Sequence, residues 1–465
     1  MNKTLVMKFG GTSVGSAAAI RNLIEITRTA KTQWPNVAII VSAMSGVTDL
    51  LLNTAHASER GELEPVEAAL RAIRQKHFAA LDELAPHATD VREQINAYLD
   101  EFKALCHAMN VLGEATPRAL DAIASLGERM SAPLAAAALA AAGVPATAID
   151  AAEVVVTDSV FQSATPDMEA TTVQVERKVR PVLEAGRVPV ITGFLGANKQ
   201  GVVTTLGRGG SDFSGAIFGV ALNAAEVWIW TDVPGVMTAD PRVVKAARTL
   251  PELTFREISE LAFFGAKVLH PKTIRPVIER GIALRVKNTF QPEHPGTEIV
   301  PDNHVAHGSV RSVTAFKGQC ITTVEGRGML GIPGIAARTF AAVARTKTSV
   351  SMISQASSEQ SICFVIPKST AETVIAALEE EFRLEIARKD IERVWASEEC
   401  AVVTVVGAGM RHTPGIAGKV FGALGAANVN VIVIAQGSSE CSISLCVAAA
   451  QADEAVRAIH ELIVV

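Results

Sequence analysis

Aromatic side chains are scarce in this sequence, which has 465 residues and a single tyrosine, Tyr98. Phe, Trp and Tyr together make up 5% of the chain, whereas 49% of its residues are hydrophobic. The core must therefore be built mainly from aliphatic side chains. The length predicts about three domains.

Long apolar runs and an excess of positive charge are also missing. No apolar stretch reaches the roughly 18 residues that a membrane-spanning helix needs, and the most apolar region, residues 131–144, is interrupted by Pro133 and Gly143. The N-terminus lacks a basic segment followed by an apolar core, so we expect no signal peptide. The net charge of −5 gives no electrostatic basis for binding nucleic acid or a membrane surface.

The cysteines show no pattern of metal binding. None of the six forms a C-x-x-C pair, and several lie in apolar, strand-like runs where a free thiol behaves as a small hydrophobic group. We therefore expect reduced thiols, no zinc site and a cytoplasmic protein.

The first informative feature is a glycine turn between a buried strand and a helix. Residues 5–7 are apolar, Gly10 and Gly11 follow, and a helical pattern covers residues 17–29. Such a turn directs backbone N–H groups at one point, which suits a phosphate, and Lys8 adds a positive charge. The spacing alone fits a plain turn with a surface lysine equally well.

A second loop of small polar residues follows the apolar run at residues 37–41. Ligands bind outside the carboxyl ends of the strands in open α/β sheets, which makes Ser42 and Thr48 candidate site residues. The local pattern by itself favours helix capping for both. Residues 57–139 are helical in pattern, and there Glu128 stands beside a glycine; the pattern alone favours a solvated surface position for it.

Strand–loop–helix units continue to about residue 290 and predict a mostly parallel sheet covered on both faces. A strand is expected at residues 188–194 and a helix at residues 172–184. Another glycine-rich loop, residues 206–212, precedes a helical pattern. In it, Asp212 is suited to capping the helix, and the planar guanidinium of Arg208 is suited to binding a carboxylate or phosphate.

The C-terminal part contains an internal repeat. Residues 334–340 resemble 415–421, and residues 351–362 resemble 433–443, so that Gln355 and Gln436 stand at matching places. Each copy predicts a ferredoxin-like βαββαβ unit. The first has a candidate closing strand near residues 391–395, whereas the second has none. We therefore predict that residues 310–316 complete the second unit, with the first unit inserted between.

Four blocks in this order resemble the aspartate kinases over essentially the whole chain; they are residues 8–14, 207–212, 231–236 and 264–271. The resemblance implies an α/β protein, with an αβα sandwich of the amino acid kinase (carbamate kinase-like) fold followed by two ferredoxin-like ACT domains. It is closest to the threonine-sensitive type, as in the kinase part of bifunctional aspartokinase–homoserine dehydrogenases. The implied domains are a catalytic domain at 1–295 with a helical insertion at about 57–140, a linker and strand at 296–317, and ACT domains at 318–396 and 397–465.

The resemblance also implies a reaction. ATP, with Mg²⁺, would phosphorylate the β-carboxylate of L-aspartate to 4-phospho-L-aspartate, the first step toward lysine, threonine and methionine. The implied catalytic residues are Lys8 and Asp212. The implied aspartate site is formed by Ser42, Thr48, Glu128 and Arg208. The implied ATP contacts are Lys8, Gly10, Gly11, Ser13, Thr231, Asp232, Met237, Arg242 and Lys267, and no side chain is assigned to the metal.

Regulation and assembly are implied as well. An amino acid effector, threonine first, would bind near Gln355, Gln436, Ile335 and Ile416, and the ACT domains would form a homodimer or homotetramer. At Gln355 and Gln436 the simpler interpretation is a pair of polar residues at strand ends.

The sequence departs from the family pattern in two respects. Met237 stands where many members have a tyrosine, and the chain ends at Val465 without a homoserine dehydrogenase domain. A single-function enzyme and a fragment of a bifunctional one both remain open. A catalytically silent ACT-based sensor is a further alternative, against which the intact Lys8, Arg208 and Asp212 argue. Kinases of acetylglutamate or glutamate are a weaker one, because they lack a tandem ACT tail of this type.

Overall fold

The computed structural model describes residues 3–207, 209–264, 269, 271–302, 310–355, 360–410, 412–437 and 439–463. The chain divides into two compact units. The first comprises residues 1–236, 251–253 and 268–300, and the second comprises residues 237–250, 254–267 and 301–465. Among the described residues, no helix combines the length and the apolar character that crossing a membrane requires.

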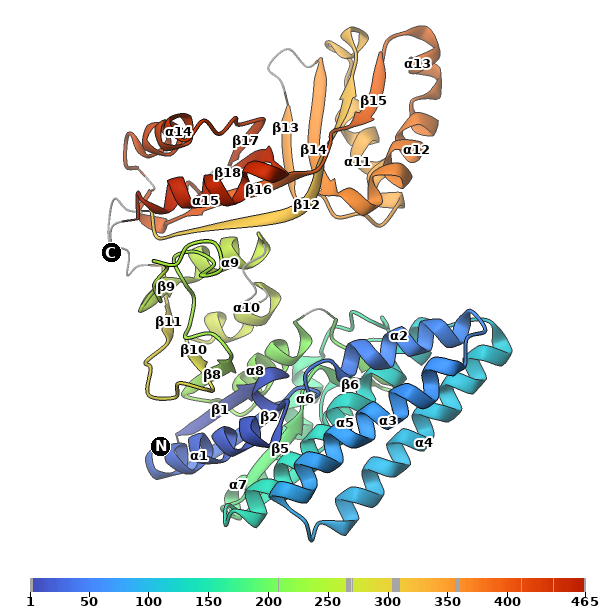
Figure 1. Ribbon diagram of the computed structural model, residues 1–465, viewed down its shortest axis with the longest axis vertical. Coiled ribbons are helices and arrows are strands. Elements are labelled where there is room, and N and C mark those ends of the chain that lie inside the picture. Colours follow the sequence, from blue (N-terminus) through green and yellow to red (C-terminus); the bar gives the residue numbers. More distant parts are fainter. Residues whose placement is uncertain are drawn as a thin grey trace. The chain divides into compact units, whose positions relative to one another are not determined.

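An eight-stranded sheet forms the centre of the first unit (Figure 1). Its middle strands pair in parallel, and every residue of β1 is buried, which explains the continuous apolar run in the sequence. The strands, in spatial order, are β3 (Ala146–Ile149), β5 (Val188–Thr192), β2 (Asn36–Val41), β1 (Thr4–Phe9), β8 (Glu226–Thr231), β10 (Ala283–Asn288), β11 (Thr297–Val300) and β9 (Glu252–Thr254).

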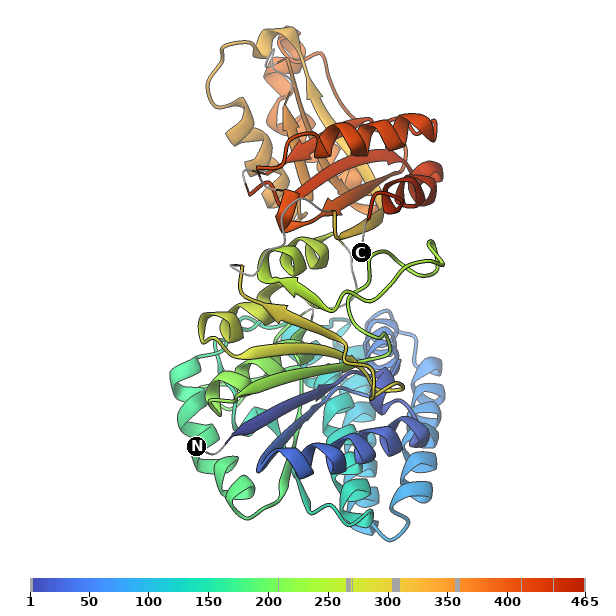
Figure 2. The ribbon, with the colours of Figure 1, turned by 90° about the vertical axis from the view of Figure 1, so that its left-hand side faces the viewer.

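Helices cover both faces of this sheet, as Figure 2 shows. The predicted helical region at residues 57–139 is confirmed, because it runs from the end of α2 to α5. The helix predicted at residues 172–184 is instead split into α6 and α7, with Pro181 near the start of the second. The helices are α1 (Ala17–Gln33), α2 (Val47–Glu59), α3 (Glu64–Leu84), α4 (Thr89–Leu112), α5 (Pro117–Ala141), α6 (Met168–Lys178), α7 (Arg180–Glu184), α8 (Gly210–Ala221) and α10 (Pro271–Glu279).

A small sheet lies beside the main one in the first unit. It consists of β4 (Val156–Thr157), β6 (Leu195–Asn198) and β7 (Val203–Thr205), and β6 and β7 form an antiparallel hairpin that the sequence pattern does not predict. The predicted linker and strand at 296–317 begin with a strand of this unit. Thr297–Val300 form β11, which turns back along β10.

The second unit is built on one continuous seven-stranded sheet. Its path is β13 (Met352–Gln355), β14 (Ser361–Pro367), β12 (Ser312–Glu325), β16 (Cys400–Val406), β18 (Ser442–Ala448) and β17 (Val433–Gln436), and β15 (Arg393–Ala396) also pairs with β12. The helices of this unit are α9 (Phe255–Phe263), α11 (Ile335–Arg345), α12 (Ala371–Glu381), α13 (Arg383–Arg388), α14 (Ile416–Ala426) and α15 (Ala452–His460).

The long strand β12 serves both ACT repeats. Ser312–Phe316 pairs with β16 of the second repeat, as predicted for residues 310–316, and Gln319–Glu325 pairs with β14 of the first. The sequence suggests two separate strands here, but the structure joins them through a register shift between Phe316 and Gln319. The closing strand expected near residues 391–395 is β15.

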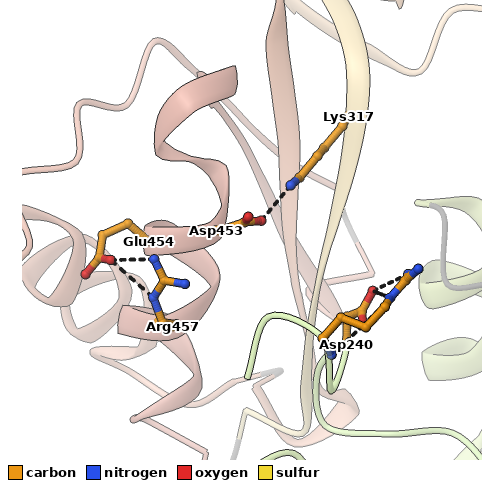
Figure 3. A network of polar contacts seen from close by, with 6 residues as sticks. Asp240, Lys317, Asp453, Glu454 and Arg457 are labelled. Carbon is orange, nitrogen blue, oxygen red and sulfur yellow. Dashed lines mark hydrogen bonds and ion pairs between the residues drawn. The ribbon is translucent and has the colours of Figure 1, made fainter. Parts of the chain in front are cut away.

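An exposed ion pair lies at this register shift of β12. Lys317 reaches Asp453 at the start of α15, and the nitrogen–oxygen distance is 2.6 Å (Figure 3). Since α15 belongs to the second repeat, this contact joins the shared strand to the helix that covers it.

Residues 237–250 share the core of the second repeat, although the predicted catalytic domain includes them. Ala239 and Val244 are buried in one cluster with Val403 and Leu445. The hydroxyl of Thr238 lies 2.9 Å from Nε2 of His460 at the end of α15. This segment, which carries Met237 and Arg242, is therefore held by apolar burial and by polar contacts within the second unit.

A glycine in α5 allows this helix to approach the loop after β2. A Cβ atom at Gly127 would lie 2.7 Å from the Cβ of Ala43, closer than two such atoms can approach. Gly127→Ala should therefore lower stability by roughly 1–3 kcal/mol through overpacking, measured by thermal unfolding.

The matched control is Gly422→Ala in α14, where an added Cβ meets nothing within 4 Å. It should raise stability by about 0.5–1 kcal/mol, because alanine favours the helix. Equal stabilisation by both substitutions would show that α5 does not approach the loop this closely.

Candidate active site

Lys8 lies near the carboxyl end of the central strand β1 and is only 7% exposed. Its ammonium group pairs with the carboxylate of Asp212, in the first turn of α8. A Cβ at Gly215 would lie 3.4 Å from the Cβ of Lys8, so α8 passes close to the strand. The structure thus contradicts the surface-lysine alternative.

The glycine turn is fixed by backbone hydrogen bonds. The N–H of Gly10 donates to the carbonyl of Trp230 at the end of β8 (3.1 Å), and the N–H of Ser45 donates to the carbonyl of Gly11 (3.0 Å). A Cβ at Gly11 would approach the carbonyl oxygen of Ala43 to 3.0 Å. The turn therefore joins the ends of β8, β1 and β2 at one edge of the sheet.

Ser13 lies within this turn but is fully buried. Its hydroxyl lies 2.6 Å from the hydroxyl of Thr289, and its N–H donates to the carbonyl of Gly10 (2.9 Å). The geometry supports a role for Ser13 in holding the turn, since both polar groups have partners within the protein.

A cavity of about 470 Å³ opens beside the turn. It is lined by the loop after β2, the start of α2, one face of α5 and the start of α8. Of the predicted site residues, it brings together Gly11, Ser42, Thr48 and Glu128.

The helix-capping interpretation of Ser42 and Thr48 is wrong. The N-cap of α2 is Gly46, without a side-chain capping bond, and Thr48 lies inside the helix. The Ser42 hydroxyl is buried without a hydrogen-bond partner. Likewise, Gly209 and not Asp212 occupies the N-cap of α8. The side chains of Ser42 and Thr48 are therefore available for other contacts, and that of Asp212 is engaged with Lys8.

Glu128 is the most perturbed group of the cavity. It is 3% exposed, contrary to the solvated position that its local pattern favours, and its Oε2 atom has no hydrogen-bond partner. Burial raises the pKa of Glu128 to about 8, although a hydrogen bond from the backbone of Ala43 and the charge of Lys8 act in the opposite direction. An unpartnered, buried carboxyl group in a cavity is suited to binding a cation.

The predicted ATP contacts lie in both units. Thr231 ends β8 in the first unit and Asp232 follows it, and the Thr231 hydroxyl donates to Asp232 at 3.2 Å. Met237 and Arg242 belong to the second unit. The guanidinium of Arg242 is exposed and bonds to Asp240, which lowers the pKa of that carboxyl group (Figure 3). Arg208 and Lys267 lie outside the described residues.

The predicted effector residues take equivalent places in the two repeats. Ile335 and Ile416 are buried first residues of α11 and α14, and each follows a left-handed glycine. Gln355 and Gln436 end the strands β13 and β17, and both are exposed.

Several cavity residues are missing from the sequence-based set. Phe194 has a φ of 72°, which is rare for a bulky residue, and its N–H bonds to the hydroxyl of Ser214. Asp121 and Ser211 also line the cavity. The turn Thr192-Gly193-Phe194 hints at an irregular strand end, but nothing in the sequence marks Asp121.

Magnesium prefers oxygen ligands, which carboxylate side chains, phosphates and water all supply. Within the described ranges there is no group of three or more His, Cys, Asp or Glu residues that could hold a metal. Mg²⁺ in phosphoryl-transfer sites is bound largely by substrate phosphates and water, with one or two carboxylates. The donor set therefore fits a metal that arrives with a nucleotide.

Glu128→Gln should remove a pH-dependent loss of stability. The carboxyl group keeps its proton up to about pH 8 in the folded protein but loses it near its ordinary pKa of 4.5 in the unfolded chain. Between these values the folded state binds more protons, so the free energy of unfolding of the wild type falls as pH rises. The variant should therefore gain in melting temperature relative to the wild type from about pH 5 to about pH 8.

The control for this measurement is Glu93→Gln on α4, where the side chain is exposed. Its melting temperature relative to the wild type should not change with pH over this range. The same result for Glu128→Gln would contradict an uncharged, buried carboxyl group.

Comparisons with known proteins agree with this architecture. Residues 3–288 match the amino acid kinase family, and residues 323–382 and 403–462 each match an ACT domain. The lysine-sensitive aspartokinase 3 of Escherichia coli is 33% identical over 99% of both chains. The crystal structure of E. coli aspartokinase III in complex with aspartate and ADP has a TM-score of 0.85, at 32% identity over 99% of both chains.

Longer relatives match as well. Bifunctional aspartokinase/homoserine dehydrogenase 1 of Arabidopsis thaliana is 34% identical over 98% of this chain but only 50% of its own length. The chain thus spans about half the length of several curated relatives that it matches. Taken together, the parallel sheet, the tandem repeat and these similarities show that the chain belongs to the amino acid kinase family, among the aspartokinases with ACT domains.

Proposed function

We propose that this chain transfers the γ-phosphoryl group of ATP to the β-carboxylate of L-aspartate, giving 4-phospho-L-aspartate and ADP. The observation that carries the proposal is the pair of the buried Lys8 and the partly buried Asp212, which lies at the same sheet edge as a cavity whose Glu128 has one carboxyl oxygen without a partner. The E. coli relative with the same fold was crystallised with aspartate and ADP.

The reaction needs no strong general base. The substrate carboxylate has a pKa near 4 and is already a nucleophile at neutral pH. Catalysis then depends on in-line positioning and on positive charge at the phosphoryl oxygens. Lys8 would stabilise that charge, and Asp212 holds its ammonium group in place. The amide of Gly11 would contact the phosphates, whereas the predicted contact of the Gly10 amide is contradicted, because that N–H already donates to the carbonyl of Trp230.

The aspartate would occupy the cavity. Glu128 would bind the substrate ammonium, whose charge favours the ionised form of this buried carboxyl group. Ser42 and Thr48 would donate hydrogen bonds to the substrate, and Arg208 would pair with its α-carboxylate. Thr231, Asp232, Met237, Arg242 and Lys267 remain the proposed contacts to the nucleotide.

Magnesium would enter with ATP and neutralise phosphate charge. Asp232, which follows β8 beside the glycine turn, would take part in holding the metal ion, whereas Asp212 is paired with Lys8. The protein's own contribution is to position the two substrates.

Lys8→Ala should lower kcat at least about 100-fold, because removing one stabilising donor in comparable sites costs about 3–4 kcal/mol. The measurement is aspartate-dependent ADP release, together with thermal unfolding to confirm the fold. Near-normal turnover in a folded variant would refute the assignment.

Lys103→Ala provides the matched control. Lys103 forms an ion pair with Glu67 on the helical insertion, with a half-exposed side chain. This variant should keep wild-type turnover, since exposed ion pairs contribute little. The same assay tests the alternative of a silent sensor, which predicts no aspartate-dependent turnover in the wild type.

For regulation, we propose that threonine binds the ACT repeats at Gln355 and Gln436 and inhibits the kinase. The segments Gln355–Ile362 and Gln436–Ile443 support this assignment, whereas lysine is the effector named for the E. coli relative. Exposed isoleucines on the edge strands, Ile353 at 52% and Ile434 at 47%, support a homodimer or homotetramer formed through the ACT domains. A cytoplasmic location stays a prediction.

Titration with threonine, lysine and both together should show inhibition by threonine. Gln355→Ala or Gln436→Ala should weaken that inhibition about tenfold through the loss of a hydrogen bond to the effector, with uninhibited kcat unchanged. Inhibition by lysine alone would overturn threonine as the effector, and inhibition equal in variants and wild type would overturn the glutamine site.

A further inference from the structure

Asp121 is a buried carboxylate that the proposed reaction does not use. It lies in the second turn of α5 and is 1% exposed. No ion pair recorded within the described ranges involves it. Burial of a charged group costs free energy unless hydrogen bonds replace its hydration. The hydrogen-bond partners of Asp121 therefore explain how this carboxylate can be buried.

Its partners are two loops that are distant in sequence. The N–H of Thr205 donates to Oδ2 at 2.9 Å, and the hydroxyl of the same residue donates to Oδ1 at 2.6 Å. The N–H of Gln162 donates to both oxygens, at 3.1 and 3.0 Å. The carboxylate thus ties the end of β7 to the loop between β4 and α6, by hydrogen bonds that its charge strengthens.

Both loops form the wall of the cavity. Gln162, Thr205, Gly207 and Asp121 itself line it. The loops also touch each other, because a Cβ at Gly207 would lie 2.8 Å from the carbonyl oxygen of Gln162. Gln162 has a φ of 65°, a conformation that a non-glycine residue keeps only when its surroundings enforce it.

Asp121 and Glu128 lie seven residues apart, about two helical turns, and so share one face of α5. Their environments differ. Glu128 has an oxygen without a partner, as a ligand-binding group would, whereas both oxygens of Asp121 accept hydrogen bonds from the protein. On α5, Glu128 therefore remains available to a ligand, whereas Asp121 binds the loops that form the cavity wall.

We propose that Asp121 is a positioning residue for the amino acid substrate: it holds the loops at Gln162 and Thr205 so that the cavity fits the short side chain of aspartate. This proposal rests on the proposed function of the cavity. It assigns to Asp121 an effect on substrate fit and on the discrimination between aspartate and the longer glutamate, with no contact to the reacting atoms.

The test is Asp121→Asn, which preserves shape but places an NH₂ group against the N–H of Gln162 or Thr205. The KM for L-aspartate should rise about tenfold, because a buried donor loses its partner. The KM for ATP should stay within about twofold. The preference for L-aspartate over L-glutamate, as a ratio of kcat/KM values, should fall by a similar factor, since one methylene in a defined pocket is discriminated by about tenfold or more.

Asp158→Asn is the matched control. Asp158 accepts hydrogen bonds from the N–H groups of Val160 and Thr165 within the same loop but makes none of the recorded bonds to α5. Its variant should keep both KM values and the substrate preference. If Asp121→Asn does not fold, Thr205→Val removes only the hydroxyl bond to Oδ1 and should shift the same quantities in the same direction.

A lower melting temperature with unchanged KM values and unchanged preference would overturn the proposal and leave Asp121 a purely structural residue. The same result for Thr205→Val would overturn it where Asp121→Asn cannot be measured. Failure of the proposed function is distinct, because the wild type itself would then show no aspartate-dependent turnover.

Discussion

The ion pair between Lys8 and Asp212 is the constraint on which the catalytic end of the protein depends. Lys8 belongs to the central strand and Asp212 to the helix α8, about two hundred residues later in the chain. An ammonium group that is almost fully buried needs a compensating charge, so β1 and α8 must lie where their side chains meet. The glycine turn follows directly after β1, and the start of α8 forms part of the cavity wall.

Charge compensation also explains the different behaviour of the two carboxyl groups on α5. Asp121 receives its hydrogen bonds from backbone and hydroxyl groups of the protein, which makes it part of the framework. Glu128 receives too few hydrogen bonds to compensate for its burial, and burial therefore raises its pKa. Because this carboxyl group has already lost its hydration, pairing with a cationic ligand stabilises it more than it would stabilise a solvated carboxylate.

The regulatory part depends on a different constraint, the shared strand β12. Because its two ends pair with different repeats, neither ACT unit has a complete sheet without it. Ala239 and Val244, in the segment 237–250, are buried in the core of the second repeat. The chain reaches this segment from β8 through Val236. A proposed nucleotide contact such as Met237 is thus built into the regulatory unit by ordinary apolar packing.

Elements whose signals are local could be predicted from the sequence. The apolar run of β1, the glycine turn, the helical region 57–139 and the repeat at Gln355 and Gln436 are visible because periodicity and turn chemistry depend on near neighbours. Counting strands even predicted that residues 310–316 complete the second repeat, since a sheet with a missing strand must be completed, and residues 312–316 do pair with β16.

The burial of polar side chains and the identity of their partners depend on contacts between segments that are distant in sequence. The local pattern placed Glu128 in solvent and made Ser42 and Thr48 helix caps, and it did not mark Asp121 or the left-handed Phe194 at all. Burial and hydrogen-bond satisfaction are set by segments that meet across the fold, such as α5 with the loops at Gln162 and Thr205. No window along the chain contains both partners, and for this reason the site could be recognised from the sequence only by resemblance to a family.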